Sequence, residues 1–402
     1  MNCYSDIIIH RPLSSSTQEQ KYLLSYNGKY YEASIAVVEL LKELQQSSTE
    51  EEAIESYVRK NEKYTLEQIR QVVDKFIIPM FRPTAEKQTF LYEKELFSAK
   101  SIDKFSNKFQ ILFNKKYMGM ILVVTLFLDA YFFSTTHDLL LFNNKVNIYM
   151  VAGLLVFILL SSFFHELGHA SSCKHFKTSH GGIGFGLYLN FPVLYTDVTE
   201  VWKLSRKQRC IVNLAGVYFQ SYLLIMLLIV FLLTSYDILR YLILIMNLGF
   251  LMTLNPFFKF DGYWLASDLL GVPNLRKRSL ELLGYLYKSI GRKSVPRKPY
   301  LLQIRPLEKY GLLIYSLVVN IFMGFYFFYI IPVFLYHFFQ KFPDAVNELI
   351  LYLSNRIIPP FALLRNISTQ LLFLGLIGYL LYKMINPLIK RLCKKITFFH
   401  PI

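Results

Sequence analysis

Two histidines and a glutamate occur together in the stretch FFHELGHASS, residues 163–172. His165 and His169 are four residues apart, a spacing that places both imidazoles on one face of an α-helix, where they can bind one metal ion. Two neutral imidazoles suit zinc and leave room for a third ligand and a water. Glu166 follows the first histidine, and its carboxylate is the expected catalytic base, which takes a proton from that water. The pattern predicts a zinc hydrolase.

The setting of this motif favours a metal site over a chance match. The residues before it, VAGLLVFILLSSFF, are apolar enough for a membrane helix. A charged side chain at the centre of such a helix costs about 2.5–3.5 kcal/mol on insertion scales, so ionisable groups there need a function.

Two residues compete for the place of third ligand. His175 fits by spacing, because HELGHASSCKH matches HExxHxxxxxH, but Ser172 stands where the soluble pattern has a turn-forming glycine. Asp261 lies in NPFFKFDG, where Pro256 breaks a helix and Gly262 permits a sharp reversal. A carboxylate at such a break is a good ligand, so we favour Asp261 and expect His175 and His180 to be solvated loop residues.

The composition is that of a multi-pass membrane protein. The 402 residues are 53% hydrophobic and 16% aromatic, and the mean hydropathy is +0.33. Segments of roughly the ~20 residues that cross a bilayer recur along the chain. We expect about six transmembrane helices, near 117–136, 148–172, 211–234, 238–256, 311–336 and 367–386.

The net charge of +16 follows the membrane topology and does not indicate a nucleic-acid partner. Residues 1–116 carry 17 basic and 16 acidic residues, so the excess lies among the apolar segments. The connections 173–210 and 271–310 hold six and ten Lys/Arg, whereas the opposite connections hold one to three. The positive-inside rule therefore predicts cytoplasmic termini in the cell membrane, and it brings HELGH and NPFFKFDG to the same depth near the cytoplasmic face.

The first 95 residues have a soluble composition. An Asn-Gly turn inside KYLLSYNGKYYEAS predicts a hairpin, and three helical patterns follow it, two of them with Ser/Thr caps. We expect a small α+β winged-helix-like domain over 1–95, a Lys-rich linker over 96–116 and a transmembrane zinc metalloprotease domain over 117–402.

HELGH together with NPFFKFDG resembles the site-2 protease family of intramembrane zinc metalloproteases, whose paired motifs are HExxH and NPxxxxDG. The resemblance implies a core of three membrane helices, His165, His169 and Asp261 as ligands of Zn2+, Glu166 as base and Asn255 beside the site as a substrate-binding residue. GGIGFGLYLNF resembles the family's glycine-rich segment that presents a strand edge to substrate, although a flexible loop fits the sequence equally well. AGVYFQ departs from the family's AGPxxN at Val217 and Gln220.

A narrower resemblance joins DVTEVWKLSRKQRCIVNLAG and FKFDGYWLASDLLGVPNLRKRS to bacterial peptide zinc metalloproteases found with ribosomally made, modified peptides. Residues 20–80 more weakly resemble the peptide-chaperone domain of pyrroloquinoline quinone biosynthesis, a winged-helix module that holds leader peptides as an added strand. A generic soluble helical cap is the alternative for this region.

Three functions remain open at this stage. The first is an intramembrane zinc endopeptidase that matures a modified peptide, with the peptide substrate, the lipid bilayer, a peptide-modifying enzyme and an exporter as partners. The second is regulated intramembrane proteolysis of a transmembrane regulator, and the third is a non-catalytic peptide export or immunity protein. Of the other acids near the membrane, Asp129 is a weaker functional candidate, and Asp268 is expected to cap its helix or pair with the basic loop after it.

Overall fold

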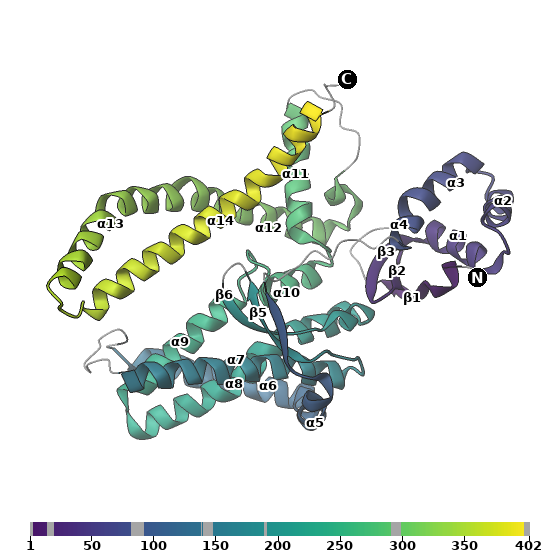
Figure 1. Ribbon diagram of the computed structural model, residues 1–402. Coiled ribbons are helices and arrows are strands. Elements are labelled where there is room, and N and C mark those ends of the chain that lie inside the picture. The colour runs from purple at the N-terminus through teal and green to yellow at the C-terminus, as the bar shows by residue number, and fades with distance from the viewer. Residues whose placement is uncertain are drawn as a thin grey trace. The chain divides into compact units, whose positions relative to one another are not determined.

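The computed structural model describes residues 3–13, 20–81, 92–137, 139, 148–188, 191–290 and 299–397. Most of these residues are helical, and a small N-terminal sheet domain precedes the long apolar helices (Figure 1). This is the fold class that the sequence predicts, a multi-pass helical membrane protein with a soluble α+β domain.

The N-terminal domain is an antiparallel sheet in the order β1-β2-β3, packed against helices. Its elements are η1 (Cys3–Asp6), β1 (Ile8–Leu13), β2 (Lys21–Tyr26), β3 (Lys29–Ser34), α1 (Ile35–Gln46), α2 (Glu50–Lys60), α3 (Leu66–Val72), the π-helix η2 (Val73–Ile77) and α4 (Ile78–Phe81). Asn27 and Gly28 both have positive φ, at 51° and 73°, so the predicted Asn-Gly hairpin turn is present. The strand β1, which the sequence did not indicate, adds to the other side of β2.

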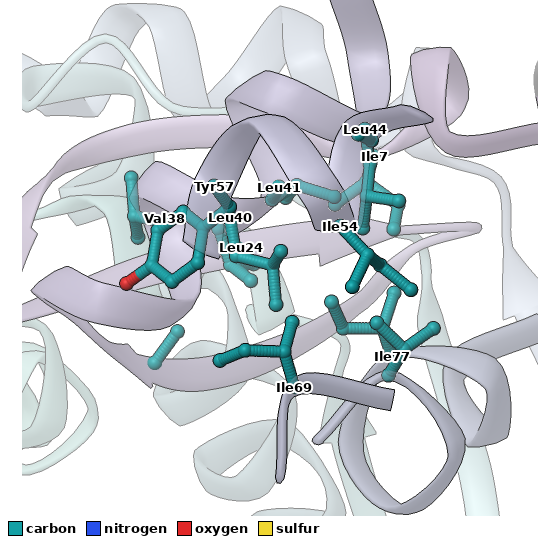
Figure 2. Close-up of a cluster of buried hydrophobic side chains, with 13 residues drawn as sticks. Ile7, Leu24, Val38, Leu40, Leu41, Leu44, Ile54, Tyr57, Ile69 and Ile77 are labelled. Atoms are coloured by element: carbon teal, nitrogen blue, oxygen red, sulfur yellow. The ribbon is translucent and has the colours of Figure 1, made fainter. Parts of the chain in front are cut away.

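Two helices of this domain, α2 and α3, begin at a threonine whose hydroxyl accepts from a free backbone N–H group. The Thr49 hydroxyl accepts from the backbone N–H of Glu52, and Thr65 and Gln68 form a reciprocal capping box. The buried apolar faces then meet in one cluster drawn in Figure 2: Ile7, Leu24, Ala33, Val38, Leu40, Leu41, Leu44, Ala53, Ile54, Tyr57, Ile69, Val73 and Ile77. All the buried residues of this core come from residues 7–77.

The following elements lead into the membrane helices. They are β4 (Glu93–Phe97), α5 (Ala99–Phe109), η3 (Gln110–Phe113), α6 (Lys115–Thr135), α7 (Ile148–His175), β5 (Ile183–Tyr188), β6 (Phe191–Thr196), η4 (Thr199–Lys203), α8 (Arg206–Thr234), α9 (Asp237–Thr253), α10 (Asp261–Leu270), α11 (Leu275–Ile290) and η5 (Tyr300–Gln303). The stretch 96–116, expected as a linker, contains α5 and η3, and both pack against α7.

The helix α8 is the centre of this part of the chain. It packs against α6, α7, α9 and α10, and α7 and α8 run side by side in Figure 1. A second sheet has the strand order β4-β5-β6. Its strands β5 and β6 lie between α7 and α8 in the sequence, whereas β4 precedes α5. The glycine-rich stretch therefore forms strand β5 in the middle of a sheet.

The C-terminal helices are α12 (Pro306–Phe325), the π-helix η6 (Tyr326–Ile330), α13 (Ile331–Ser354) and α14 (Phe361–Thr397). The helices α13 and α14 pack against each other, with Ala345, Leu363 and Ile367 in a buried apolar cluster.

Five helical stretches in the described residues are long and apolar enough to cross a membrane, judged by length and composition. They are Lys115–Thr135, Met150–His175, Arg206–Thr234, Pro306–Ser354 and Phe361–Tyr379. The fourth expected segment, 238–256, corresponds to α9, which is not among these five; its 17 residues rise about 25 Å against a hydrocarbon thickness of ~30 Å.

Candidate metal centre

Three side chains converge where α7 meets the start of α10. The Nε2 atom of His165 lies 2.9 Å from Asp261 Oδ2 and 3.2 Å from His169 Nε2, and His169 Nε2 lies 3.2 Å from Asp261 Oδ2. Ligands at 2.0–2.2 Å from a tetrahedral zinc ion are roughly 3.3 Å apart, so this spacing is close to that of a zinc site. The two imidazoles and one carboxylate are thus grouped closely enough to hold one metal ion.

The Nδ1 atoms of both histidines are held by α8. His169 Nδ1–H donates to the backbone carbonyl of Val212 at 2.8 Å, and His165 Nδ1–H donates to the side-chain oxygen of Gln220 at 3.1 Å. A hydrogen bond at Nδ1 fixes the tautomer and leaves the lone pair of Nε2 free for a metal. Both histidines are therefore oriented as metal ligands.

Gln220 is itself held in place by a second contact with α7. Its side-chain N–H donates to Ser161 Oγ at 2.8 Å and to the Ser161 carbonyl at 3.3 Å. Because the amide nitrogen is held by Ser161, the amide oxygen faces His165. In the sequence Gln220 stands out only as a departure from the AGPxxN pattern, which does not predict this role. The signal that could have revealed it is a polar side chain four residues after Gly216 in an otherwise apolar segment.

Small residues bring α7 and α8 close enough for these contacts. A Cβ atom on Gly168 would clash with the carbonyl oxygen of Ala215, and one on Gly216 would clash with the imidazole of His165. Glycines at helix contacts let backbones approach closely in membranes. The glycine of HELGH thus serves the packing of α7 on α8, and Gly216 makes the space that His165 occupies.

The break after α9 places Asp261. The chain leaves α9 before Pro256, and Asn255 Oδ1 accepts from the backbone N–H of Phe257 at 2.8 Å to stabilise the turn. A Cβ on Gly262 would clash with the carbonyl of Leu254, so only glycine allows the chain to fold back here. Asn255 therefore holds the turn through its side-chain oxygen, and its role in substrate binding stays a prediction.

Asp261 is the first residue of α10 and is suited to bind a cation. Its Oδ2 atom lies 2.9 Å from His165 Nε2 and 3.2 Å from His169 Nε2, where a metal ion bound by both imidazoles would be within reach of the carboxylate. An ionised carboxylate between two imidazoles is an appropriate third zinc ligand.

Glu166 is buried, with 8% of its surface exposed, directly after the first histidine. Its backbone carbonyl accepts from the hydroxyl of Thr196 on β6 at 3.3 Å. The strand β6 therefore runs beside the residue expected to act as base.

The other histidines near the motif have different surroundings. His175 packs its ring against Phe113 and Phe176, with centroids 6.0 and 4.9 Å away. The expectation that His180 is a solvated loop residue is wrong, because its side chain is fully buried and lies 3.1 Å from Asp103 and 3.2 Å from Ser106 of α5. The alternative third ligand, His175, is not part of the metal-binding group.

Asp129 in α6 accepts a hydrogen bond from the side-chain N–H of Asn247 in α9 at 2.9 Å. This contact explains an acid within an apolar helix, since a partner lowers the cost of keeping a polar group in the bilayer.

Comparison with known proteins yields one short match. Over 73 residues the chain is 36% identical to a Bacillus subtilis (strain 168) protein named "Putative peptide zinc metalloprotease protein YydH". The match covers 18% of this chain and 29% of the length of that relative. No family model and no solved structure matches the chain. The comparisons thus support a metalloprotease relationship coarsely and give no support to the resemblance with pyrroloquinoline quinone biosynthesis.

The space for His165 gives a direct test of the site. We expect Gly216→Ala to weaken zinc binding by at least roughly tenfold, because the added methyl displaces an imidazole whose orientation sets metal affinity. Zinc affinity is measured by competition with a chromophoric chelator on purified protein.

Gly249→Ala is the matched control, since Gly249 lies in α9 with open space around its position. Equal zinc affinity of the two variants would contradict the packing of Gly216 on His165.

Proposed function

We propose that this protein is an intramembrane zinc endopeptidase that cleaves a peptide or membrane-associated substrate near the cytoplasmic face of the cell membrane. The observation that carries the proposal is the convergence of His165, His169 and Asp261 beside the buried Glu166. Four residues with these chemical roles, brought together from α7 and α10, are what metal-assisted peptide hydrolysis requires. The name of the Bacillus subtilis relative agrees with this reaction.

Zinc, when bound, supplies Lewis-acid polarisation and lowers the pKa of a water from ~15.7 to about 7. His165 and His169 present Nε2 to the ion while α8 holds their Nδ1 atoms, and Asp261 contributes one carboxylate oxygen. Glu166 takes the proton of the attacking water on its carboxylate and gives it to the leaving amine nitrogen.

The sheet β4-β5-β6 suggests how an extended substrate is held. The strand β4 covers one edge of β5, and β6 is the outer strand on the other side of the described sheet. A peptide added to β6 would lie beside Glu166, since Thr196 of that strand contacts it. Main-chain hydrogen bonds of this kind give affinity with little dependence on side chains.

We further propose that the N-terminal domain docks the peptide before cleavage. In the described sheet β3 is an outer strand, and beside its end lies a groove of about 560 Å³. The groove is lined mainly by apolar side chains of α1, α3, η2 and the turn before α3, with two lysines: Val37, Leu40, Tyr64, Ile69, Val72, Phe76, Lys63 and Lys75. These features suit an extended peptide with apolar and acidic residues.

The proposed topology counts α9 as a crossing in addition to the five longer helical stretches. Six crossings with the basic connections 173–210 and 271–310 on the inside, as the positive-inside rule requires, place both termini in the cytoplasm. The docking domain and the metal centre then lie on one side of the membrane. A peptide matured in this way would be made and modified in the cytosol, so a modifying enzyme and an exporter are the proposed partners.

We predict that Glu166→Gln keeps zinc and loses hydrolysis by about 10²-fold or more, because an amide cannot take the proton of the attacking water. Zinc content and single-turnover cleavage of a peptide substrate are measured on the same preparation. Glu348→Gln, a change at an exposed position of α13, is the control and should retain full activity. Unaltered turnover in zinc-loaded Glu166→Gln would assign the base to another group.

We also predict that removal of residues 1–91 raises KM for the native peptide and leaves zinc content and cleavage of a short generic peptide intact. The reason is that docking raises the local substrate concentration without touching the metal. The cut precedes β4, which pairs with β5 and stays in the truncated protein.

Two point variants distinguish a loss of peptide docking from a general disturbance of the N-terminal domain. Phe76→Asp places a charge in the groove, whereas Ile8→Asp places one on β1, and the two residues are 56% and 59% exposed. Only Phe76→Asp should raise KM for the native peptide. Loss of zinc on truncation, or equal effects of the two variants, would show that the domain is a structural cap.

A further inference from the structure

A buried ion pair joins the beginning of α8 to α10. Arg209 Nε donates to Asp268 Oδ1 at 2.6 Å, and the two side chains are only 5% and 11% exposed. The other carboxylate oxygen of Asp268 accepts from the side-chain N–H of Asn213 at 2.8 Å. Asp268 thus pairs with Arg209 of α8. The expectation of a partner in the basic loop after Asp268 is wrong.

A second arginine of α8 holds the end of α10. Arg206 Nε donates to the backbone carbonyl of Asp268 at 3.0 Å, and its guanidinium also bonds the carbonyl of Leu269. It packs against Gly271, whose φ of 61° ends α10 and whose position leaves no room for a Cβ. The C-terminal turn of α10 is therefore fixed to α8 by side-chain and main-chain contacts.

This attachment is connected to the metal centre through α8 and α10. Asp261 and Asp268 are seven residues apart on α10, so they lie on nearly the same face two turns from each other. On α8, Asn213 contacts Asp268, while Gly216 and Gln220, three and seven residues further on, contact His165. One side of α8 therefore meets both the helix that carries Asp261 and the histidines.

We propose that Arg209, Asp268 and Asn213 form a positioning cluster that sets the register of α10 on α8 and so brings Asp261 to the metal. The inference rests on the proposed zinc site and extends it to residues that do not touch the ion. A buried ion pair contributes little net stability compared with apolar packing, but it strongly disfavours arrangements in which either charge is left alone. A one-turn slip of α10 would separate Asp268 from both Arg209 and Asn213 at once.

The expected effect is on metal affinity. A ligand must lie within about 0.5 Å of its productive position, and loss of supporting contacts around metal ligands costs 10–100-fold in affinity. Asp268→Asn keeps the shape of the side chain and removes its charge, so it should weaken zinc binding by that factor. Asn213→Ala removes one hydrogen bond and leaves the ion pair, so it should cause a smaller loss.

The test is a double-mutant cycle on the full-length protein in detergent, with the zinc Kd measured by chelator competition. Asp268→Asn and Asn213→Ala are each made in the unaltered chain and in Asp261→Ala. The cluster acts through Asp261 if both changes weaken zinc binding in the unaltered chain and have no further effect in Asp261→Ala. Asp129→Asn, which removes another charge with an asparagine partner, is the control and should leave the Kd unchanged.

The same loss in both backgrounds, or no loss in either, overturns the inference while the zinc site stands. If Asp268→Asn does not fold, the milder Asn213→Ala decides by the same comparison. If the unaltered chain binds no zinc, the proposed metal site is refuted and the positioning role falls with it.

Discussion

The close approach of α7 and α8 is the contact on which the candidate site depends. Gly168 lies against the backbone of Ala215, and Gly216 lies against the imidazole of His165. Without a side chain at these positions the helices can approach until main-chain and side-chain groups of α8 reach both histidines. A larger residue at either glycine would separate the helices and remove the hydrogen bonds that orient Nε2 toward the metal.

Three polar side chains of this region have partners that hold the site together. His169 donates to Val212, His165 to Gln220, and Gln220 in turn to Ser161. In a bilayer an unpaired polar group costs several kcal/mol, so these hydrogen bonds make a buried polar site tolerable. The same contacts restrict the ligands to one geometry, which means that the membrane environment favours the arrangement that binds a metal.

Local patterns in the sequence predicted the candidate metal ligands. The hydrogen bonds that orient these ligands depend on contacts between segments distant in sequence. The spacing of His165 and His169 follows from helical periodicity, and the proline and glycine around Asp261 marked a break at that point. The structure brings these three residues together. The Asn-Gly hairpin was predicted because a two-residue turn is a local property.

Apart from β1, the missed features join segments distant in sequence. The strand β4 pairs with β5 about 90 residues away, and Asp268 pairs with Arg209 across the membrane segments between them. His180 reads as a loop residue in isolation, and only its packing against α5 buries it. Side-chain partners of this kind depend on the tertiary fold, which a single sequence without its relatives does not specify.

Zinc binding by His165, His169 and Asp261 is tested most directly by X-ray absorption spectroscopy at the zinc edge on the purified, zinc-loaded protein. The account predicts one zinc per chain bound by two imidazole nitrogens and at least one carboxylate oxygen, at about 2.0–2.2 Å. Asp261→Ala should remove the oxygen ligand and leave both imidazoles. A spectrum with three imidazoles, or one that Asp261→Ala does not change, would contradict the account, because it would show that Asp261 is not a ligand.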